Sequence, residues 1–247
     1  MTFKVVIPAR YASTRLQGKP LLDIADKPMV VRVAEQAIKS GASEIVIATD
    51  FEKIMQAAAA HNIKSVMTRI DHASGTDRIA EVAQQLGWAD DEIVVNVQGD
   101  EPLIDPKLIQ EVAAHLANSK DAVMATACHA IHDEASFLNP NIVKVVMDAN
   151  GSALYFSRSP IPYPRDDIYK ANIQAHRHIG IYAYRVGFLK KYAELAVTEL
   201  EKIESLEQLR VLHHGYKIGV TITTNAPASG VDTQEDLDYV RSVFKDK

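Results

Sequence analysis

The sequence predicts an α/β fold with a mostly parallel central sheet that helices cover on both faces. Short apolar runs rich in β-branched residues alternate with longer stretches of helical periodicity through the first half of the chain. This alternation favours parallel strands joined by crossover helices, and strands that are apolar throughout are typical of a sheet buried on both faces. The 247 residues, 47% of them hydrophobic, are enough for one large domain with a sizeable core.

The first half of the chain carries the clearest part of this pattern. We expect strands at 3–8, 44–49, 63–68, 92–98 and 122–128, and helices at 28–40, 52–61, 76–87 and 105–117. Asp105 is the expected N-cap of the last helix, because Pro106 follows at the first helical position, where its missing N–H costs nothing. The strand at 92–98 is almost entirely apolar, so we place it in the centre of the sheet.

The second half of the chain has a different character. We expect strands at 142–148, 152–158, 176–186 and 217–224, and helices at 187–197, at 203–213 and from 233. Most of these strands have no helix between them, which indicates antiparallel pairing or a smaller lobe. The segment at 159–168 contains three prolines and is expected to be a loop.

Charge and composition exclude several classes of protein. The formal net charge is −5, so we expect no non-specific binding to nucleic acid or anionic membranes. No apolar run approaches the length of a membrane span, and the N-terminus lacks the pattern of a signal peptide. We therefore expect a cytoplasmic protein with no membrane partner. The single cysteine, Cys128, rules out an intramolecular disulfide.

A cationic loop follows the first strand. Arg10, Arg15 and Lys19 lie in the segment PARYASTRLQGKP, which contains no acidic residue. The loop starts at the carboxyl end of its strand, where open α/β sheets bind their ligands. Arginine matches the geometry of phosphate oxygens, and small residues such as Ser13 let backbone N–H groups come close. We therefore predict a polyphosphate site, with a solvated basic surface loop as the alternative.

Two acidic turns suggest a metal site. The strand at 92–98 is followed by Asp100, and a carboxylate at this position can hold Mg²⁺ together with substrate phosphates. Asp232 precedes a helix whose start resembles a capping box, with Thr233 and Asp236 three residues apart. If the fold brings Asp232 beside Asp100, the two carboxylates would form one metal site. An ordinary acidic turn and a helix cap are the alternatives.

The segment HASGTDR at 72–78 combines small and hydroxyl-bearing residues at the start of a helix. Ser74 and Thr76 have hydroxyls that could hydrogen-bond a base or a ribose. The alternative is a helix N-cap, and one segment can serve both purposes.

The strand at 176–186 has a polar and aromatic face. Alternate residues of a strand share a face, so His178 and Tyr182 lie together on the side opposite Ile179 and Ile181. Such a face suits a sugar pocket. The H-x-H motif could instead bind zinc, but no Cys or third His at a suitable spacing supports that reading.

Two further segments offer polar contacts to a substrate. In the helix predicted at 203–213, Glu207 and Gln208 lie on the side opposite the apolar residues, where a solvated surface is the alternative. Arg158, in FSRSPIP, could bind a substrate carboxylate through two parallel hydrogen bonds. Its alternative is a structural ion pair.

Taken in order, these motifs resemble one family. The segments similar to 3-deoxy-manno-octulosonate (KDO) cytidylyltransferases, the CMP-KDO synthetases, are VVIPARYASTRLQGKPL, HASGTDR, NVQGDEPLI, FSRSPIP, HIGIYAYR, ESLEQLR and GVDTQEDL. The resemblance spans nearly the whole chain. Gln17 and Gln234 replace two prolines of the family pattern, neither of which supplies a reactive group.

The resemblance implies a three-layer α/β/α nucleotide-diphospho-sugar transferase fold and a single nucleotidyltransferase domain over 1–247. Within it, 1–130 would mainly bind CTP, about 131–215 would bind the sugar and form a homodimer, and 216–247 would return to the core sheet. The family makes CMP-KDO and pyrophosphate from CTP and KDO for lipopolysaccharide biosynthesis, with Mg²⁺ as its cofactor. A cytidylyltransferase for another sugar acid, like the CMP-sialic acid synthetases, is the alternative.

The resemblance also implies roles for individual residues. The nucleotide-binding set is Pro8, Arg10, Ser13, Arg15, Lys19, His72, Ser74, Gly75 and Asp100. The sugar-binding set is Gln98, Arg158, His178, Tyr182, Glu207 and Gln208. The catalytic set is Arg15, Lys19, Asp100 and Asp232, of which Asp100 and Asp232 would bind Mg²⁺. In the implied reaction the anomeric C2 hydroxyl of KDO attacks the α-phosphorus of CTP in line.

Overall fold

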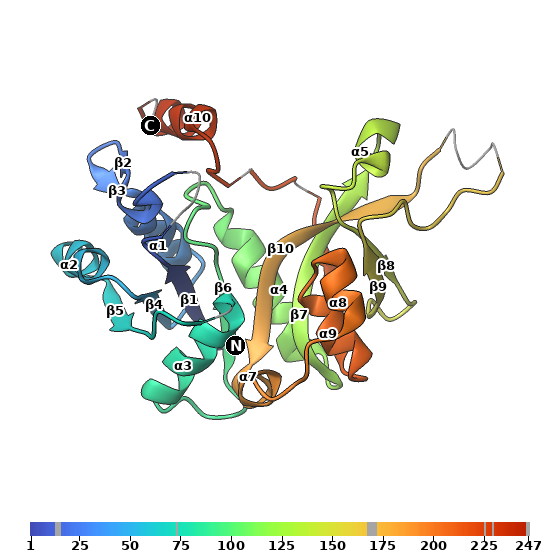
Figure 1. The fold of residues 1–247 in the computed structure, drawn as a ribbon, viewed down its shortest axis with the longest axis horizontal. Coiled ribbons are helices and arrows are strands. Elements are labelled where there is room, and N and C mark those ends of the chain that lie inside the picture. Colours follow the sequence, from blue (N-terminus) through green and yellow to red (C-terminus); the bar gives the residue numbers. More distant parts are fainter. Residues whose placement is uncertain (13–15, 73, 167–171, 225, 229, 246–247) are drawn as a thin grey trace.

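One nine-stranded sheet runs through the molecule, with its main strands in the order β11-β7-β10-β6-β1-β4-β5. The computed structural model describes all residues except 13–15, 73, 167–171, 225, 229 and 246–247 (Figure 1). Among the described residues, no helix has both the length and the apolar character needed to cross a membrane.

The predicted parallel half of the sheet is present. Its strands are β1 (Lys4–Ala9), β4 (Glu44–Thr49), β5 (Lys64–Met67) and β6 (Ile93–Asn96), and β1 pairs in parallel with both β4 and β6. The connecting helices are α1 (Met29–Lys39), α2 (Glu52–Ala60), α3 (Gly75–Gln85) and α4 (Pro106–Asn118). As predicted, β6 lies inside the sheet and the Asp105 side chain caps α4.

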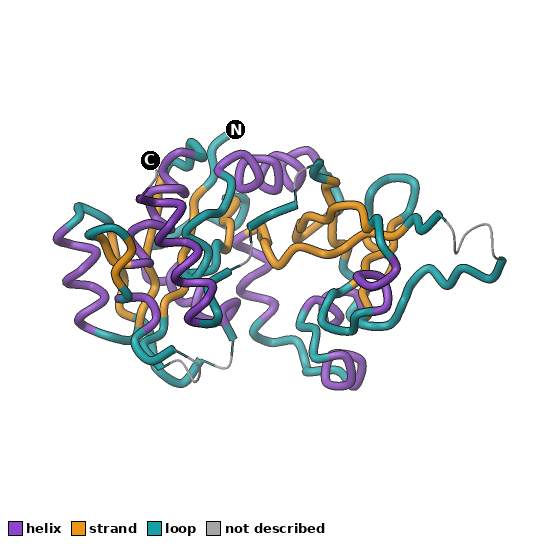
Figure 2. Tube along the Cα trace, turned by 90° about the horizontal axis from the view of Figure 1, so that it is seen from above, coloured by secondary structure: helices purple, strands orange, loops and turns teal. Residues whose placement is uncertain are grey.

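Helices cover both faces of this sheet, so the side chains of alternate strand residues enter two separate cores. Val5 and Ile7 of β1 pack in the core that includes α1 and α4, whereas Val6 faces the core that includes α3. Figure 2 shows the strands between these helical layers when the molecule is viewed from above. The three-layer α/β/α architecture is therefore confirmed.

The second half adds antiparallel strands to the same sheet. The long strand β10 (Ala175–Arg185) runs antiparallel between β6 and β7 (Ala122–Ile131). The hairpin of β8 (Lys144–Met147) and β9 (Ala153–Ser157) pairs with the start of β10, and β11 (Lys217–Ile222) pairs in parallel with β7. Antiparallel pairing of this half was predicted, and its main strand lies within the central sheet (Figure 1).

The single helix predicted at 203–213 is wrong. The chain forms α8 (Glu199–Glu204) and α9 (Gln208–His213), which follow α7 (Val186–Tyr192). Ser205 breaks the helix with a φ of 52°, in the left-handed region. The break turns Glu207 and Gln208 at the start of α9 away from the direction that a continuous helix would give them.

Short elements that the sequence did not indicate complete the fold. They are the 3₁₀-helix η1 (Lys19–Leu21), the strands β2 (Asp23–Ile24) and β3 (Lys27–Pro28), and the helix α5 (Glu134–Leu138). Ile24 packs with Val231 and with Leu237 of α10 (Gln234–Lys245) in a small separate core. This contact brings the C-terminal segment back across the molecule to the loop after β1 (Figure 1).

Candidate active site

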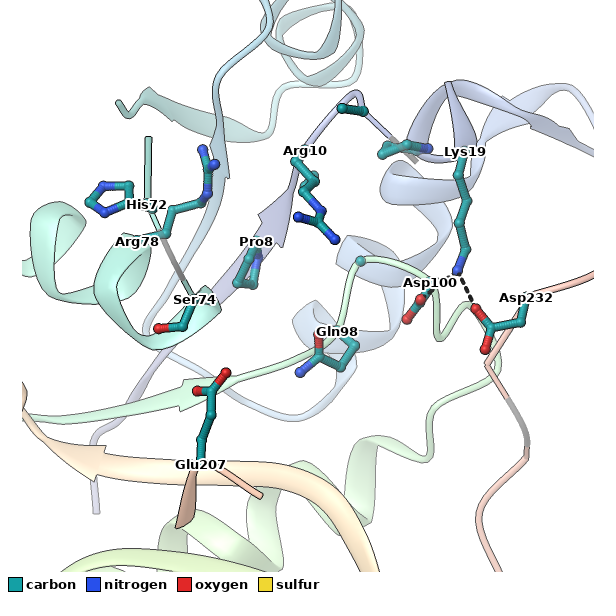
Figure 3. Close-up of a pocket in the computed structure, with 15 residues that line it drawn as sticks. Pro8, Arg10, Lys19, His72, Ser74, Arg78, Gln98, Asp100, Glu207 and Asp232 are labelled. Atoms are coloured by element: carbon teal, nitrogen blue, oxygen red, sulfur yellow. Dashed lines mark hydrogen bonds and ion pairs between the residues drawn. The ribbon is translucent and has the colours of Figure 1, made fainter. Parts of the chain in front are cut away.

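A cavity of about 380 Å³ opens at the carboxyl ends of β1 and β6, the edge at which the sequence predicted a ligand. The lining residues from the predicted nucleotide-binding set are Pro8, Arg10, Lys19, His72, Ser74, Gly75 and Asp100. Arg10 and Lys19 extend into the same space from the two ends of the opening loop (Figure 3). Ser13 and Arg15 lie outside the described residues.

Close packing of two strand ends shapes this cavity. The parallel pairing of Val6 with Asn96 brings Pro8 and Gln98 to the same edge of the sheet. A Cβ atom on Gly99 would lie 2.7 Å from the carbonyl oxygen of Pro8, so a larger residue would force the turn away. Gly99 therefore lets the turn after β6 pass against the end of β1 and present Asp100 to the cavity.

Lys19 bridges the two carboxylates that the sequence predicted as a pair. Its Nζ donates to Asp100 Oδ2 at 2.6 Å and to Asp232 Oδ1 at 3.1 Å (Figure 3). The backbone N–H of Val231 donates to the carbonyl of Asp100 at 2.9 Å, which holds the C-terminal segment beside the turn after β6. The predicted juxtaposition of Asp100 and Asp232 is therefore present.

The helix cap is separate from the carboxylate pair. Thr233 Oγ1 accepts a hydrogen bond from the backbone N–H of Asp236, whose side chain accepts from the N–H groups of Asp232 and Thr233. This reciprocal arrangement is a capping box. Capping therefore uses the backbone N–H of Asp232 and leaves its carboxylate directed at Lys19.

The carboxylate pair fits a cation that is shared with a substrate. One ammonium group already contacts an oxygen of each carboxylate, so a single cation at that position can reach both. Among the described residues, no cluster of three or more His, Cys, Asp or Glu side chains is arranged to hold a metal. Mg²⁺ is commonly held by one or two carboxylates plus phosphate oxygens and water, and this donor set matches that pattern.

An arginine that the sequence analysis did not single out lines the same cavity. Arg78 of α3 is 4% exposed, and its guanidinium donates to Asp50 Oδ2 at 2.9 Å and to the hydroxyl of Thr68. Asp50 also accepts a hydrogen bond at 3.4 Å from the backbone N–H of Tyr11 in the opening loop. Asp50 follows β4 as Asp100 follows β6, so the strand-end rule that identified Asp100 could have identified it too.

The HASGTDR segment is both a cap and a wall of the cavity. Ser74 Oγ accepts from the N–H of Asp77 at 3.1 Å, as expected for an N-cap, and Ser74 also lines the cavity with Gly75. His72 contacts the carboxylate of Glu81, which fixes the imidazole at the cavity wall. The two readings of this segment are therefore compatible.

A second cavity of about 280 Å³ adjoins the first. Gly75, Gln98 and Glu207 line both cavities, so they mark the boundary between them. Tyr182 and Gln208, which the sequence also assigned to a sugar, line the second cavity. Thr76, which the sequence analysis placed near a base or ribose, also lines the second cavity, and the lining residues not assigned to a ligand include Asn96, Tyr184 and Tyr192.

The two other residues of the predicted sugar-binding set lie outside the described walls of both cavities. The His178 ring packs 5.4 Å from the Tyr182 ring, and desolvation lowers the pKa of His178 to about 3. Its Nε2 lies 3.0 Å from the hydroxyl of Thr126, which in turn donates to the carbonyl of Ile181 at 2.7 Å. The same hydroxyl lies 3.0 Å from the carbonyl of Ile179, so its single proton is directed at a carbonyl, and we assign the imidazole proton to Nε2 of His178 as the donor to Thr126.

Arg158 has structural partners. Its Nε donates to the carbonyl of Glu204 at 2.6 Å, and its Nη1 donates to the carbonyl of Pro140 at 3.1 Å. The carboxylate of Glu204 in turn accepts from the Ser157 hydroxyl and from the backbone N–H of Arg158. In this arrangement the guanidinium fixes the link between β9 and α8.

Comparisons with known proteins identify the class as nucleotidyltransferase, which agrees with the fold and the two adjoining cavities. The cytidylyltransferase family model matches residues 4–218. A solved structure of CMP:2-keto-3-deoxy-manno-octonic acid synthetase complexed with CTP is 43% identical, with a TM-score of 0.92 over 100% of this chain and 99% of that chain. The chain belongs to the cytidylyltransferase family.

A more distant structure shares the fold. A cytidylyltransferase from Leptospira borgpetersenii serovar Hardjo-bovis is 18% identical, with a TM-score of 0.64 over 100% of this chain and 88% of that chain. At this identity the similarity supports the architecture alone.

Proposed function

We propose that the protein transfers CMP from CTP to KDO and releases pyrophosphate. The observation that carries this proposal is the full-length similarity, at 43% identity, to a CMP-KDO synthetase whose structure was solved with CTP. The two cavities support it, because one is lined by cations and a carboxylate pair and the other by tyrosines and amides. A polyphosphate and a polyhydroxylated sugar acid would meet at their boundary.

In this proposal the first cavity binds CTP. Arg10 and Lys19 contact the phosphates, joined by Ser13 and Arg15 of the same loop. His72, Ser74 and Gly75 lie near the base and ribose in this proposal. Figure 3 shows His72 and Ser74 on the opposite side of the cavity from the carboxylate pair. The charge of the cavity is local, so the net charge of −5 does not oppose binding of a polyanion.

Asp100 and Asp232 hold Mg²⁺ in this proposal, together with the phosphates of CTP. When bound there, Mg²⁺ would neutralise charge on the phosphates and favour deprotonation of the attacking hydroxyl. Lys19 would then leave its position between the carboxylates, and its ammonium would donate to phosphate oxygens instead. Its contribution grows as charge develops on the departing pyrophosphate.

The second cavity binds KDO in this proposal. Gln98 and Glu207 hold the reacting end at the boundary, while Tyr182 and Gln208 contact the remainder of the sugar. The C2 hydroxyl gives its proton to water and its oxygen bonds to the α-phosphorus. The bond from that phosphorus to the oxygen that bridges the α- and β-phosphates breaks, and pyrophosphate leaves with this oxygen. Arg158 and His178 stay predicted sugar contacts, and Arg158 would first have to release the two carbonyls it binds.

We place this reaction in the cytoplasm, where CTP is made, as a step of lipopolysaccharide biosynthesis. We also propose a homodimer that forms through residues of the 131–215 part, and sedimentation at decreasing protein concentration tests it. Within the single domain, 1–130 would mainly bind CTP and 216–247 would complete the core.

Pyrophosphate release from CTP with Mg²⁺ and a panel of sugar acids tests the proposed function. We expect release with KDO and much slower release with N-acetylneuraminate, and none when EDTA removes the metal. A preference for N-acetylneuraminate would favour the alternative cytidylyltransferase activity. The absence of release with every eight-carbon and nine-carbon acid would refute the proposal.

A further inference from the structure

We infer that Asn96 and Tyr192 determine the specificity of the second cavity by binding hydroxyl groups of the sugar that lie remote from the reacting carbon. This inference rests on the proposed function, because it names the part of the sugar acid that two unassigned residues recognise. The evidence is a set of buried polar atoms that have no protein partner.

Three such atoms belong to the lining of the second cavity. Asn96, Tyr192 and Gln208 are 4%, 3% and 4% exposed. Asn96 Oδ1, the Tyr192 hydroxyl and Gln208 Nε2 have no hydrogen-bond partner among the residues that the structure describes. A buried polar group without a partner is destabilising, and native proteins contain few of them. Their convergence on one cavity indicates a polar ligand that completes them.

Asn96 is held rigidly by the sheet. It is the last residue of β6, where it pairs with Tyr182 of β10 on one side and with Val6 of β1 on the other. Its side chain lies near the hydroxyl of Tyr184, and its Oδ1 has no hydrogen-bond partner among the described residues. Turning the amide over would exchange an unpaired acceptor for an unpaired donor, so one end remains available to a ligand in either orientation.

Tyr192 has a fixed ring and an unused hydroxyl. The ring lies 6.2 Å from the ring of Phe188 and 4.8 Å beneath the guanidinium of Arg210, so packing holds it in place. Phenylalanine would fill the same space without burying a hydroxyl. Burial raises the pKa of Tyr192, so the hydroxyl keeps its proton and can donate as well as accept.

The position of these residues indicates that they contact the part of the sugar that is remote from C2. Gly75, Gln98 and Glu207 line both cavities, so the reacting C2 end must lie beside them. Asn96 and Tyr192 line the second cavity alone, and they are almost completely buried. They therefore face hydroxyls of the ring or of the exocyclic chain. A site built to hydrogen-bond a hydroxyl discriminates strongly against an analogue that lacks it.

Tyr192→Phe tests the inference, with Tyr216→Phe as the matched control. Tyr216 packs against the same Phe188 at 5.1 Å, but it lies outside the lining of both cavities. We measure kcat and KM for KDO and for CTP, the melting temperature without substrates, and turnover of single-deoxy analogues of KDO at C4, C5, C7 and C8. Asn96→Leu is assayed in the same way.

We expect Tyr192→Phe to raise KM for KDO about tenfold, with KM for CTP unchanged and a melting temperature no lower than that of the wild type. One deoxy analogue should be a poor substrate for the wild type, because it lacks the hydroxyl that Tyr192 binds. Tyr192→Phe should not lower activity on this analogue further, since the analogue and the variant each remove one side of the same hydrogen bond. Asn96→Leu should show the same pattern with a different analogue. Tyr216→Phe should leave every KM and the order of the analogues unchanged.

Suppose that the wild type is active on KDO, but that Tyr192→Phe and Asn96→Leu change neither KM for KDO nor the discrimination between KDO and its deoxy analogues. That result would overturn the inference and leave the proposed function standing. A wild type that accepts no sugar acid would overturn both. A lowered melting temperature with unaltered discrimination would assign the Tyr192 hydroxyl to structure.

Discussion

Replacing Asp100 with asparagine should remove most of the turnover and leave the fold intact. Asp100 contacts Lys19 at 2.6 Å, and the two side chains are 35% and 12% exposed, respectively. Asp232 remains at 3.1 Å from the same ammonium, so Lys19 keeps a carboxylate partner. A partly exposed ion pair contributes at most about 1 kcal/mol, which corresponds to a shift of about 2–4 °C in Tm for a chain of this size.

The charge balance of the site makes the expected loss of stability smaller still. Burial and the neighbouring charge of Asp100 raise the pKa of Glu101 to about 8, against the opposing effect of Lys19. Glu101 is therefore protonated at neutral pH, and Asp100 and Asp232 carry two negative charges against the one positive charge of Lys19. The asparagine relieves the repulsion between these two carboxylates while it keeps the shape of the side chain.

Activity should respond very differently from stability. Asparagine retains one carbonyl oxygen but no charge, so the proposed Mg²⁺ site loses one of its two carboxylates. Outer-shell changes at metal sites already cost about 10–100-fold, so we expect kcat to fall by more than about 100-fold. CTP binding should change much less, because the cations of the opening loop remain.

Two measurements separate these effects. Pyrophosphate release is followed at saturating CTP and KDO over a titration of Mg²⁺, and Tm is measured without substrates. Asp121→Asn is the control, because Asp121 forms a Lys–Asp pair with Lys217 at 3.1 Å outside both cavities. Turnover near that of the wild type at saturating Mg²⁺ would refute the assignment of Asp100 as a metal ligand.

Three other substitutions test separate parts of the site. Lys19→Ala should lower kcat by about 100-fold or more with little change in KM for CTP, since its contribution grows in the transition state, and an effect on KM alone would contradict this. Asp50→Ala should lower the free energy of unfolding, measured by urea denaturation, by about 3–5 kcal/mol, because it leaves the buried Arg78 guanidinium without its partner at 2.9 Å. A decrease below about 1 kcal/mol would contradict a structural role for this ion pair. His178 has a folded-state pKa of about 3 against 6.5 unfolded, so its stabilisation is present above pH 6.5 and is lost as the pH falls toward 3. Between pH 6.5 and pH 5, the free energy of unfolding should therefore fall less in His178→Gln than in the wild type, by a difference of at most about 2 kcal/mol. Equal pH dependence of the free energy of unfolding in the two proteins would count against the lowered pKa.

The sequence predicted those elements that follow from a single hydrophobic pattern and those site residues that lie directly after a strand. The strand 92–98 could be placed centrally because it is apolar throughout, and Asp100 followed from the rule that ligands bind at carboxyl ends of strands. The helix break at Ser205 could not be predicted, since a left-handed φ at a serine is not expressed in helical periodicity. That break decides where Glu207 and Gln208 point.

Residues that meet only through tertiary packing were also beyond the sequence. Asn96 ends β6, and Tyr192 ends α7 almost a hundred residues later. In the sequence each resembles an ordinary core residue of its own element. The hydrophobic pattern predicts that a residue is buried, but it does not predict whether its polar atoms find hydrogen-bond partners. Only the packed structure shows that both polar groups line one cavity without partners.

The charges around the second cavity determine how a sugar acid can enter it. Glu207 is the only acidic or basic residue among its described lining residues, and the nearby Arg210 is paired with Glu201 at 2.7 Å. Among these lining residues, no cationic side chain can therefore pair with the carboxylate of KDO inside the second cavity. In the proposed complex the carboxylate is drawn toward the first cavity, where Arg10 and Lys19 supply positive charge. Because the carboxylate is attached to C2, the same attraction brings the C2 hydroxyl toward the phosphates of CTP.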